Sequence, residues 1–362
     1  MKPPPLGAVN AKCPDSRRFA DLRHAEYDWY VRRTRSCRAA RGPAVQTFYG
    51  LPAIDPPLQA SVLTVGNFDG VHRAHQRLLA KACALAREAG TRVVVLTFEP
   101  HPLTVVAPEK APPCLTPLAD KLAHLEAGGA DITAVAKSEP ALLTMTAEQF
   151  VEEVLVRRFH PIHVVEGPTF GFGRGRKGTP QLLDALSDKH GYQLHIVEPV
   201  TIQMEDGSTP MVSSSLIRRL LRDGQVGAAA RCLTRPYSIT GVVVPGRSMG
   251  RRMGFPTANL GPTDQVILGD GVYAGAATIE KGVFPCAMNL GAAPTFSIEQ
   301  PRIEAHLLDF DGDLYGQSIR LTFLRRLRSQ VKFTSAEALA SQLRADVQAV
   351  RAGAQTAAVT SA

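Results

Sequence analysis

The chain has 362 residues, of which 44% are hydrophobic and 20% are charged, a composition typical of a globular protein long enough for two domains. It contains neither an apolar run long enough for a membrane helix nor the apolar core of a secretion signal, so we expect a soluble, cytoplasmic protein. The net charge of +8 is gathered at one end, because residues 1–43 carry ten Lys or Arg against four Asp or Glu.

This basic arm, residues 1–43, is expected to be a disordered extension. The rest of the chain is close to neutral, which argues against a nucleic-acid-binding face on the folded part. An RNA-binding protein that uses the arm is the rival interpretation. The six cysteines are scattered without a C-x-x-C pair, so the sequence predicts neither a disulfide framework nor a zinc site.

The first half of the chain alternates short β-branched runs with helical periods, a pattern typical of a parallel sheet covered by helices. Strands are predicted at 61–65, 92–97 and about 163–165. Helices are predicted to end before Gly90, to begin after Thr116 and Thr146, and to begin at Pro180. Two short helices over 213–233 lead to a domain boundary near residue 235.

The second half has a different pattern. Short strand candidates at 237–244, 271–279, 283–290, 302–308 and 318–324 are separated by Gly, Pro and Asp turns, which predicts an antiparallel barrel. A final helix opens at Ser335, with a buried stripe of Leu339, Leu343, Val347 and Val350. Residues 353–362 are expected to form a disordered tail.

Residues 66–75 form the first chemically informative run. They read G-N-F-D-G-V-H-R-A-H, so a glycine-flanked turn leads from a strand into a helix. The free N–H groups and the positive helix end at such a turn bind phosphates. His72 and His75 lie on one face of the first helical turn and could donate hydrogen bonds to a triphosphate, although a structural or metal-binding pair has the same spacing.

This run resembles the G-x-F-D-G-x-H-x-G-H signature of bacterial FAD synthetases. Three further motifs resemble that family in the same order: T-F-E-P-H-P at 97–102, F-G-F-G-R-G-R at 170–176 and S-S-S-L-I-R at 213–218. The resemblance implies a Rossmann-like nucleotidyltransferase domain over residues 44–234. It implies catalytic roles for His72, His75 and Arg218. It implies ATP or phosphate binding by Gly66, Asn67, Phe68, Asp69, Gly70, Gly173, Arg174, Ser214 and Ser215, and flavin binding by Pro100, His101 and Pro102.

Each motif also has a plain structural interpretation. These are a mobile loop around Gly173, a helix N-cap with a solvated Arg218, and a rigid proline turn at His101. The sequence also departs from the family pattern at three positions. Ala74 replaces Gly and could crowd a phosphate, Thr169 replaces Asp or Asn, and Ser215 replaces Thr.

The second informative run contains spaced glycines but no Walker motif. G-V-V-V-P-G at 241–246 and Gly250 precede G-F-P-T-A-N-L at 254–260. Thr257 and Asn259, two residues apart on an extended segment, would point the same way and offer oxygens to Mg²⁺. A Gly/Pro turn with a satisfied Asn is the alternative.

P-T-A-N is typical of riboflavin kinases, and the runs at 271–274, 289–296 and 304–310 resemble further motifs of that family. The resemblance implies a six-stranded antiparallel β-barrel with a C-terminal helix over residues 235–352. It implies that Glu304 is the catalytic base, that Thr257 and Asn259 hold the metal, that Gly246, Gly250 and Gly254 bind phosphate, and that Tyr273, Asn289 and Arg325 bind flavin. Glu304 could instead pair with Arg302 or Arg320, and Ala293 stands where the family commonly has Arg.

Together the resemblances cover residues 44–352 and imply a bifunctional enzyme of flavin cofactor synthesis. The expected partners are riboflavin, FMN and ATP, with Mg²⁺ as cofactor and no membrane or nucleic-acid partner. A mostly monomeric protein with transient oligomers is expected. The alternative is a monofunctional riboflavin kinase whose N-terminal domain is degenerate, as the substitutions at Ala74 and Thr169 suggest.

Overall fold

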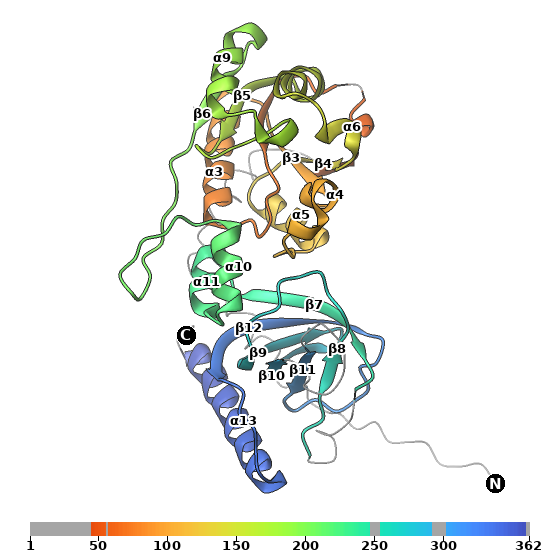
Figure 1. The fold of residues 1–362 in the computed structure, drawn as a ribbon, viewed down its shortest axis with the longest axis vertical. Coiled ribbons are helices and arrows are strands. Elements are labelled where there is room, and N and C mark those ends of the chain that lie inside the picture. The colour runs from red at the N-terminus through yellow and green to blue at the C-terminus, as the bar shows by residue number, and fades with distance from the viewer. Residues whose placement is uncertain (1–44, 56, 247–253, 292–301, 360–362) are drawn as a thin grey trace, which may run out of the picture. The chain divides into compact units, whose positions relative to one another are not determined.

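The computed structural model describes residues 45–55, 57–246, 254–291 and 302–359 (Figure 1). The chain divides into two compact units. The sheet unit contains the described residues through Tyr237 together with Asp264–Gly269, and the barrel unit contains Ser238–Thr263 and the residues from Asp270 onward. The basic arm at 1–43, Gly250 and Ala293 lie outside the described residues, so the expectations for them stay predictions.

Six parallel strands form the sheet of the sheet unit, in the order β1-β4-β3-β2-β5-β6. The strands are β1 Gln46–Tyr49, β2 Ser61–Val65, β3 Arg92–Glu99, β4 Ile132–Lys137, β5 Pro161–Glu166 and β6 Gln193–Ile196. The predicted parallel α/β fold is confirmed. Three of these strands, β1, β4 and β6, were not predicted individually.

Helices cover both faces of this sheet (Figure 1). The helices of the sheet unit are α3 Arg73–Glu88, α4 Leu103–Val106, α5 Leu118–Ala127, α6 Pro140–Leu143, α7 Ala147–Gln149, the π-helical Phe150–Val156, α8 Arg157–Phe159, α9 Pro180–His190, α10 Ser214–Arg222 and α11 Val226–Leu233. Side chains of β2 alternate between the two faces, since Val62 packs against α3 and Leu63 packs on the opposite side. All five residues of the strand, which was predicted at these positions, are therefore buried.

The order of the strands determines where a ligand can bind. Strand β2 lies between β3 and β5, so the chain leaves the centre of the sheet in both directions. In open parallel sheets, ligands bind beyond the carboxyl ends of the strands at such a reversal point. The residue after β2 is Gly66, and the first informative run therefore begins at this point.

The barrel unit is a closed six-stranded barrel with the order β10-β11-β8-β7-β12-β9, which confirms the predicted architecture. Its strands are β7 Tyr237–Val244, β8 Ala258–Leu260, β9 Gly271–Ile279, β10 Gly282–Gly291, β11 Arg302–Leu307 and β12 Ser318–Arg328. Strand β8 replaces the turn that was considered for the P-T-A-N run. Strand β12 is longer than predicted and includes Arg325.

The C-terminal helix α13, Ala336–Val359, packs on the barrel through two bidentate ion pairs. Arg328 binds Asp346, and Arg351 binds Asp309, at N···O distances of 2.6–3.0 Å. The helix continues past residue 352 into the segment expected to be disordered, because that segment is rich in alanine, the best helix former.

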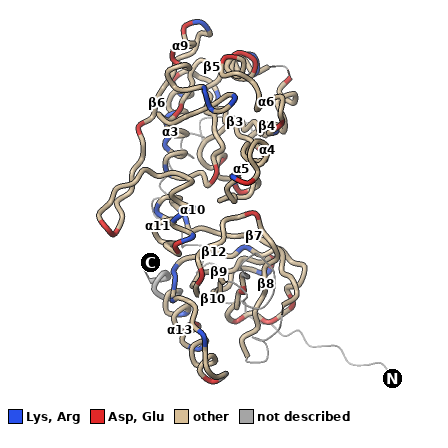
Figure 2. Tube along the Cα trace, in the orientation of Figure 1, with Lys and Arg blue, Asp and Glu red and all other residues tan. Residues whose placement is uncertain are grey.

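Two further features of the described residues bear on possible partners. No helix among them combines the length and the hydropathy that crossing a membrane requires. Lys and Arg are interspersed with Asp and Glu along both units (Figure 2).

Candidate functional sites

The turn between β2 and α3 has an unusual backbone. Phe68, Gly70 and Val71 have positive φ angles of 48°, 86° and 38°. A Cβ on Gly70 would also lie 3.0 Å from the Leu115 side chain, so both conformation and space favour glycine there. Phe68 and Val71 are buried in one apolar cluster, which holds the strained turn in place. The turn thus fixes where α3 begins.

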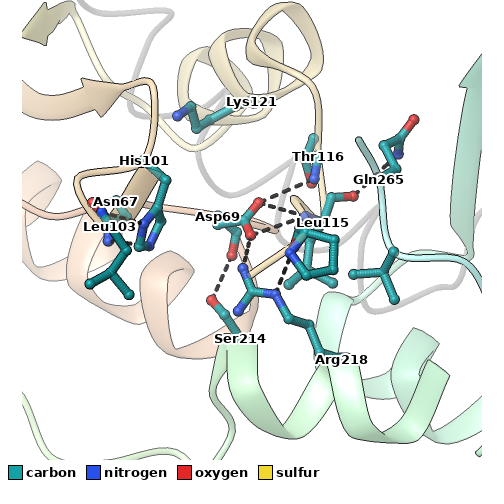
Figure 3. A network of polar contacts seen from close by, with 12 residues as sticks. Asn67, Asp69, His101, Leu103, Leu115, Thr116, Lys121, Ser214, Arg218 and Gln265 are labelled. Atoms are coloured by element: carbon teal, nitrogen blue, oxygen red, sulfur yellow. Dashed lines mark hydrogen bonds and ion pairs between the residues drawn. The ribbon is translucent and has the colours of Figure 1, made fainter. Parts of the chain in front are cut away.

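Asp69 lies at the centre of a buried polar network in this turn (Figure 3). Its carboxylate accepts hydrogen bonds from the backbone N–H of Leu115, at 2.9 Å, and of Thr116, at 3.1 Å. The Arg218 guanidinium forms an ion pair with the same carboxylate. The Ser214 hydroxyl donates to the Asp69 carbonyl at 2.9 Å. Three predicted residues from two distant segments, Asp69, Ser214 and Arg218, are therefore brought together.

Arg218 is buried, whereas the helix-cap interpretation expected a solvated side chain. Its Nε donates to the Pro113 carbonyl at 2.8 Å, while its Nη2 donates to the Asp69 carboxylate. Burial lowers the pKa of Arg218, and the charge of Asp69 opposes that shift. Removing one member of a buried ion pair costs about 3–5 kcal/mol, because the other charge is left uncompensated. In the structure Asp69 and Arg218 thus brace the turn, and their charges are directed at each other.

His72 and His75 stack at the start of α3, with ring centroids 3.7 Å apart and an interplanar angle of 16°. The Nδ1 atom of each ring is buried and has no hydrogen-bond partner among the described residues. Burial lowers the pKa of His75 to about 3, and burial together with His75 lowers the pKa of His72 well below 6.5. Both imidazoles are therefore neutral near pH 7.

This burial has a measurable consequence for stability. The unfolded chain protonates His75 below pH 6.5, whereas the folded chain keeps it neutral down to about 3. Because the unfolded state binds more protons in this window, the free energy of unfolding is expected to fall as the pH decreases through it. His75→Gln is expected to make that fall shallower, as measured by urea unfolding at several pH values. An unchanged pH dependence would contradict the burial of this ring.

The predicted flavin turn meets the predicted ATP turn through one side-chain contact (Figure 3). The Asn67 amide lies 3.0 Å from Nε2 of His101, and Nδ1 of His101 accepts the Leu103 N–H at 3.2 Å. Burial lowers the pKa of His101, so this ring is also neutral near pH 7. The sequence predicted both residues as binding groups but not the contact between them.

Other predicted groups of the sheet unit lie outside the Asp69 network. Gly173, with φ of 68°, packs on Ala147 at the start of α7. The Arg174 side chain is exposed, and its backbone N–H donates to the Met145 carbonyl at 2.8 Å. Ser215 is exposed on α10. The structure therefore gathers some of the predicted phosphate-binding residues and leaves the side chains of Arg174 and Ser215 exposed.

Sequence reasoning missed Glu166, a buried acid at the end of β5. Its Oε1 accepts the Val65 N–H at 2.6 Å, beyond the last paired residues of β2 and β5. Burial raises the pKa of Glu166 well above 4.5. The sequence signal that could have identified Glu166 is its position as the single acidic residue at the end of the strand Pro161–Glu166.

In the barrel unit, three predicted residues lie in one row across neighbouring strands. Glu304 on β11 is directly opposite Asn259 on β8 and directly opposite Asn289 on β10. Residues directly opposite each other in antiparallel strands share a face of the sheet. No hydrogen bond or ion pair holds the Glu304 carboxylate within the described part of the chain, so the pairing with Arg320 is not formed.

Three further predicted residues lie near Asn259, in space or along the chain. A Cβ on Gly246 would lie 2.1 Å from the Asn259 amide nitrogen, so the backbone at Gly246 passes directly over this side chain. Thr257 is half-buried and precedes β8 by one position. Gly254 has φ of 81° in the turn before it. The backbone at Gly246 and the side chain of Asn259 are thus close together, and Thr257 lies two residues from Asn259 in the chain.

The predicted flavin contacts are only partly brought together. Oδ1 of Asn289 accepts a hydrogen bond from Gln330 at 3.1 Å, a partner that the sequence did not indicate. Tyr273 is fully buried and packs edge-on against Phe323, so it lies in the barrel core and outside the row. Arg325 donates to the Ala349 carbonyl of α13 at 3.3 Å.

Two family models match the chain, one in the first half and one in the second half. The family model described as FAD synthetase matches residues 55–211, and the model described as riboflavin kinase matches residues 233–353. The chain is 37% identical over 294 residues to the bifunctional riboflavin kinase/FMN adenylyltransferase of Bacillus subtilis, covering 80% of this chain and 90% of that protein. The Haemophilus influenzae protein of the same name is 35% identical over 309 residues, covering 85% and 99%.

A similar solved structure spans both units. It is the crystal structure of a Streptococcus pneumoniae protein named as a macrolide-efflux protein, with a TM-score of 0.74 and 30% identity, covering 85% of this chain and 99% of that chain. With both halves matched by family models and the relatives aligned over nearly their whole length, the chain belongs to the family of bifunctional riboflavin kinase/FMN adenylyltransferases.

Proposed function

We propose that the barrel unit phosphorylates riboflavin with ATP to give FMN, and that the sheet unit adenylylates FMN with a second ATP to give FAD and pyrophosphate. The observation that carries the proposal is the row of Asn259, Glu304 and Asn289 on three paired strands. Family membership supports both activities, and the site roles below combine the resemblance of the motifs with the positions of their residues.

In the barrel unit, Glu304 is the general base. Its carboxylate has no partner in the described part of the chain and removes the proton of the ribityl 5′-hydroxyl while that oxygen attacks the γ-phosphorus of ATP. The new oxygen–phosphorus bond forms as the bond to the ADP oxygen breaks. Asn289, fixed by Gln330, orients the flavin from the neighbouring strand.

Thr257 and Asn259 fit a magnesium ion. They offer neutral oxygens, which this hard cation prefers, and the close approach of Gly246 to Asn259 leaves room for backbone but not for a further side chain. When bound with ATP, Mg²⁺ would neutralise charge on the phosphate oxygens. The backbone N–H groups at Gly246 and Gly254 then bind the same phosphates.

In the sheet unit, the start of α3 receives the triphosphate of the second ATP. An FMN phosphate oxygen attacks the α-phosphorus, and pyrophosphate leaves. The neutral His72 and His75 rings donate hydrogen bonds as charge grows on the leaving group. The pair of Asp69 and Arg218 holds the turn that presents these rings.

An assay with two separate substrates tests the proposal. The purified chain is expected to make FMN from riboflavin and ATP, and to make FAD from supplied FMN and ATP. Chromatographic separation of the flavins measures both rates. FMN formation without any FAD would instead favour a monofunctional riboflavin kinase, in which Ala74 and Thr169 mark a sheet unit that has lost adenylyl transfer.

A further inference from the structure

Six residues of the sheet unit lie far from the rest of it in sequence. The segment Asp264–Gly269, here called the strap, follows β8 and precedes β9, yet it belongs to the sheet unit. Its backbone is fastened at two places. The backbone N–H of Cys114 donates to the Asp264 carbonyl, and the Cys114 carbonyl accepts the Val266 N–H, both at 2.9 Å. The Gly269 N–H donates to the Leu221 carbonyl at 3.0 Å.

Within the strap, the Gln265 side chain is directed inward. It is only 4% exposed, and its Nε2 donates to the Leu115 carbonyl at 3.4 Å (Figure 3). A side-chain hydrogen bond also joins Gln265 to the buried Tyr237. The neighbouring Val266 is buried and accepts the Tyr237 hydroxyl at 2.8 Å. The amide is thus held in one orientation by residues on both sides.

Leu115 connects this amide to the adenylyl-transfer turn. Its carbonyl receives Gln265, whereas its N–H donates to the Asp69 carboxylate. The Leu115 side chain also packs against Gly70, the glycine of the same turn. Without Gln265, the buried Leu115 carbonyl would lose this partner, and the segment that carries two donors to Asp69 would be free to shift.

We propose that Gln265 is a positioning residue for adenylyl transfer, which acts through Leu115 and Asp69 on the turn that presents His72 and His75. This inference rests on the function proposed for that turn. It means that the sequence between two barrel strands supplies part of the sheet unit's transfer machinery.

Gln265→Met in the full-length chain tests the proposal, because methionine keeps the length of the side chain and removes the donor. The kcat of FAD formation from FMN and ATP is expected to fall about tenfold, the effect of one lost buried hydrogen bond. The KM values should change little, since Gln265 contacts neither substrate in the proposal. FMN formation by the same preparation should stay unchanged. Asp264→Ala, which alters an exposed side chain of the strap, is the matched control.

Gln265→His provides the complementary measurement, because its ring N–H can replace the lost donor and should restore most of the kcat. Should Gln265→Met fail to fold, Gln265→Asn, whose amide is one methylene shorter, is expected to show the same loss of kcat. Wild-type FAD formation by Gln265→Met or Gln265→Asn, or an equal loss of FMN formation, would overturn the proposal. If the wild-type chain itself makes no FAD, the proposed function fails, which is a distinct result.

Discussion

Glu304→Gln is expected to reduce FMN formation by about 10²–10⁴-fold, the usual contribution of a general base, while FAD formation from supplied FMN continues at the wild-type rate. The amide keeps the size and the hydrogen-bonding reach of the side chain but cannot accept the ribityl proton. Because Glu304 lies in register between Asn259 and Asn289, a change confined to its charge should leave the row intact. Separate rates of FMN and FAD formation measure the effect.

The control for this variant is Glu280→Gln, which makes the same chemical change at an exposed turn of the barrel unit. It should leave both rates unchanged. Near-normal FMN formation by Glu304→Gln would contradict the role of this carboxylate as the general base. An equal loss of both activities would show that the two reactions do not use separate sites.

His75→Ala is expected to have the opposite effect. FAD formation should fall by about 10²–10³-fold, the cost of removing one donor to a developing oxyanion, while FMN formation is retained. The unaffected kinase rate then serves as an internal measure of correctly folded protein. The substitution also removes the partner of the stacked His72 ring, so circular dichroism should accompany the assay.

His190→Ala, at the end of α9 in the same unit, is the matched histidine control. Its FAD formation should equal that of the wild type. Wild-type FAD formation by His75→Ala would mean that the stacked pair at the start of α3 is structural. That outcome would restore the structural interpretation of the two rings that the sequence left open.

The sequence predicted the architecture well, because periodicity and turn residues report burial directly. Short β-branched runs alternate with helical periods around β2 and β3 because helices cover both faces of the sheet. The Gly, Pro and Asp turns delimit the strands of the barrel. Short edge strands such as β1 and β6 escaped prediction, since half-exposed runs of four residues carry little pattern. The P-T-A-N run was considered as a turn because three residues are too few to show the alternation of a strand.

The site residues were predicted less completely. Motifs identified Asp69 and Arg218 as polar groups of the site, but their pairing depends on a tertiary contact across 149 residues of sequence. The donors at Leu115 and Thr116 are backbone N–H groups, which leave no mark on side-chain identity. Tyr273 was assigned to the flavin from its motif, although its position in the strand directs the ring into the core.

The strap limits how the protein can be divided. A fragment that stops at Tyr237, the apparent end of the sheet unit, would lack Gln265 and expose the edge where Cys114 pairs. A fragment that begins at Ser238 would carry Val266 and Leu268, both buried in the intact chain, with no surface of its own unit to cover them. Engineering the two halves as independent proteins therefore requires the strap to be copied into one and redesigned in the other.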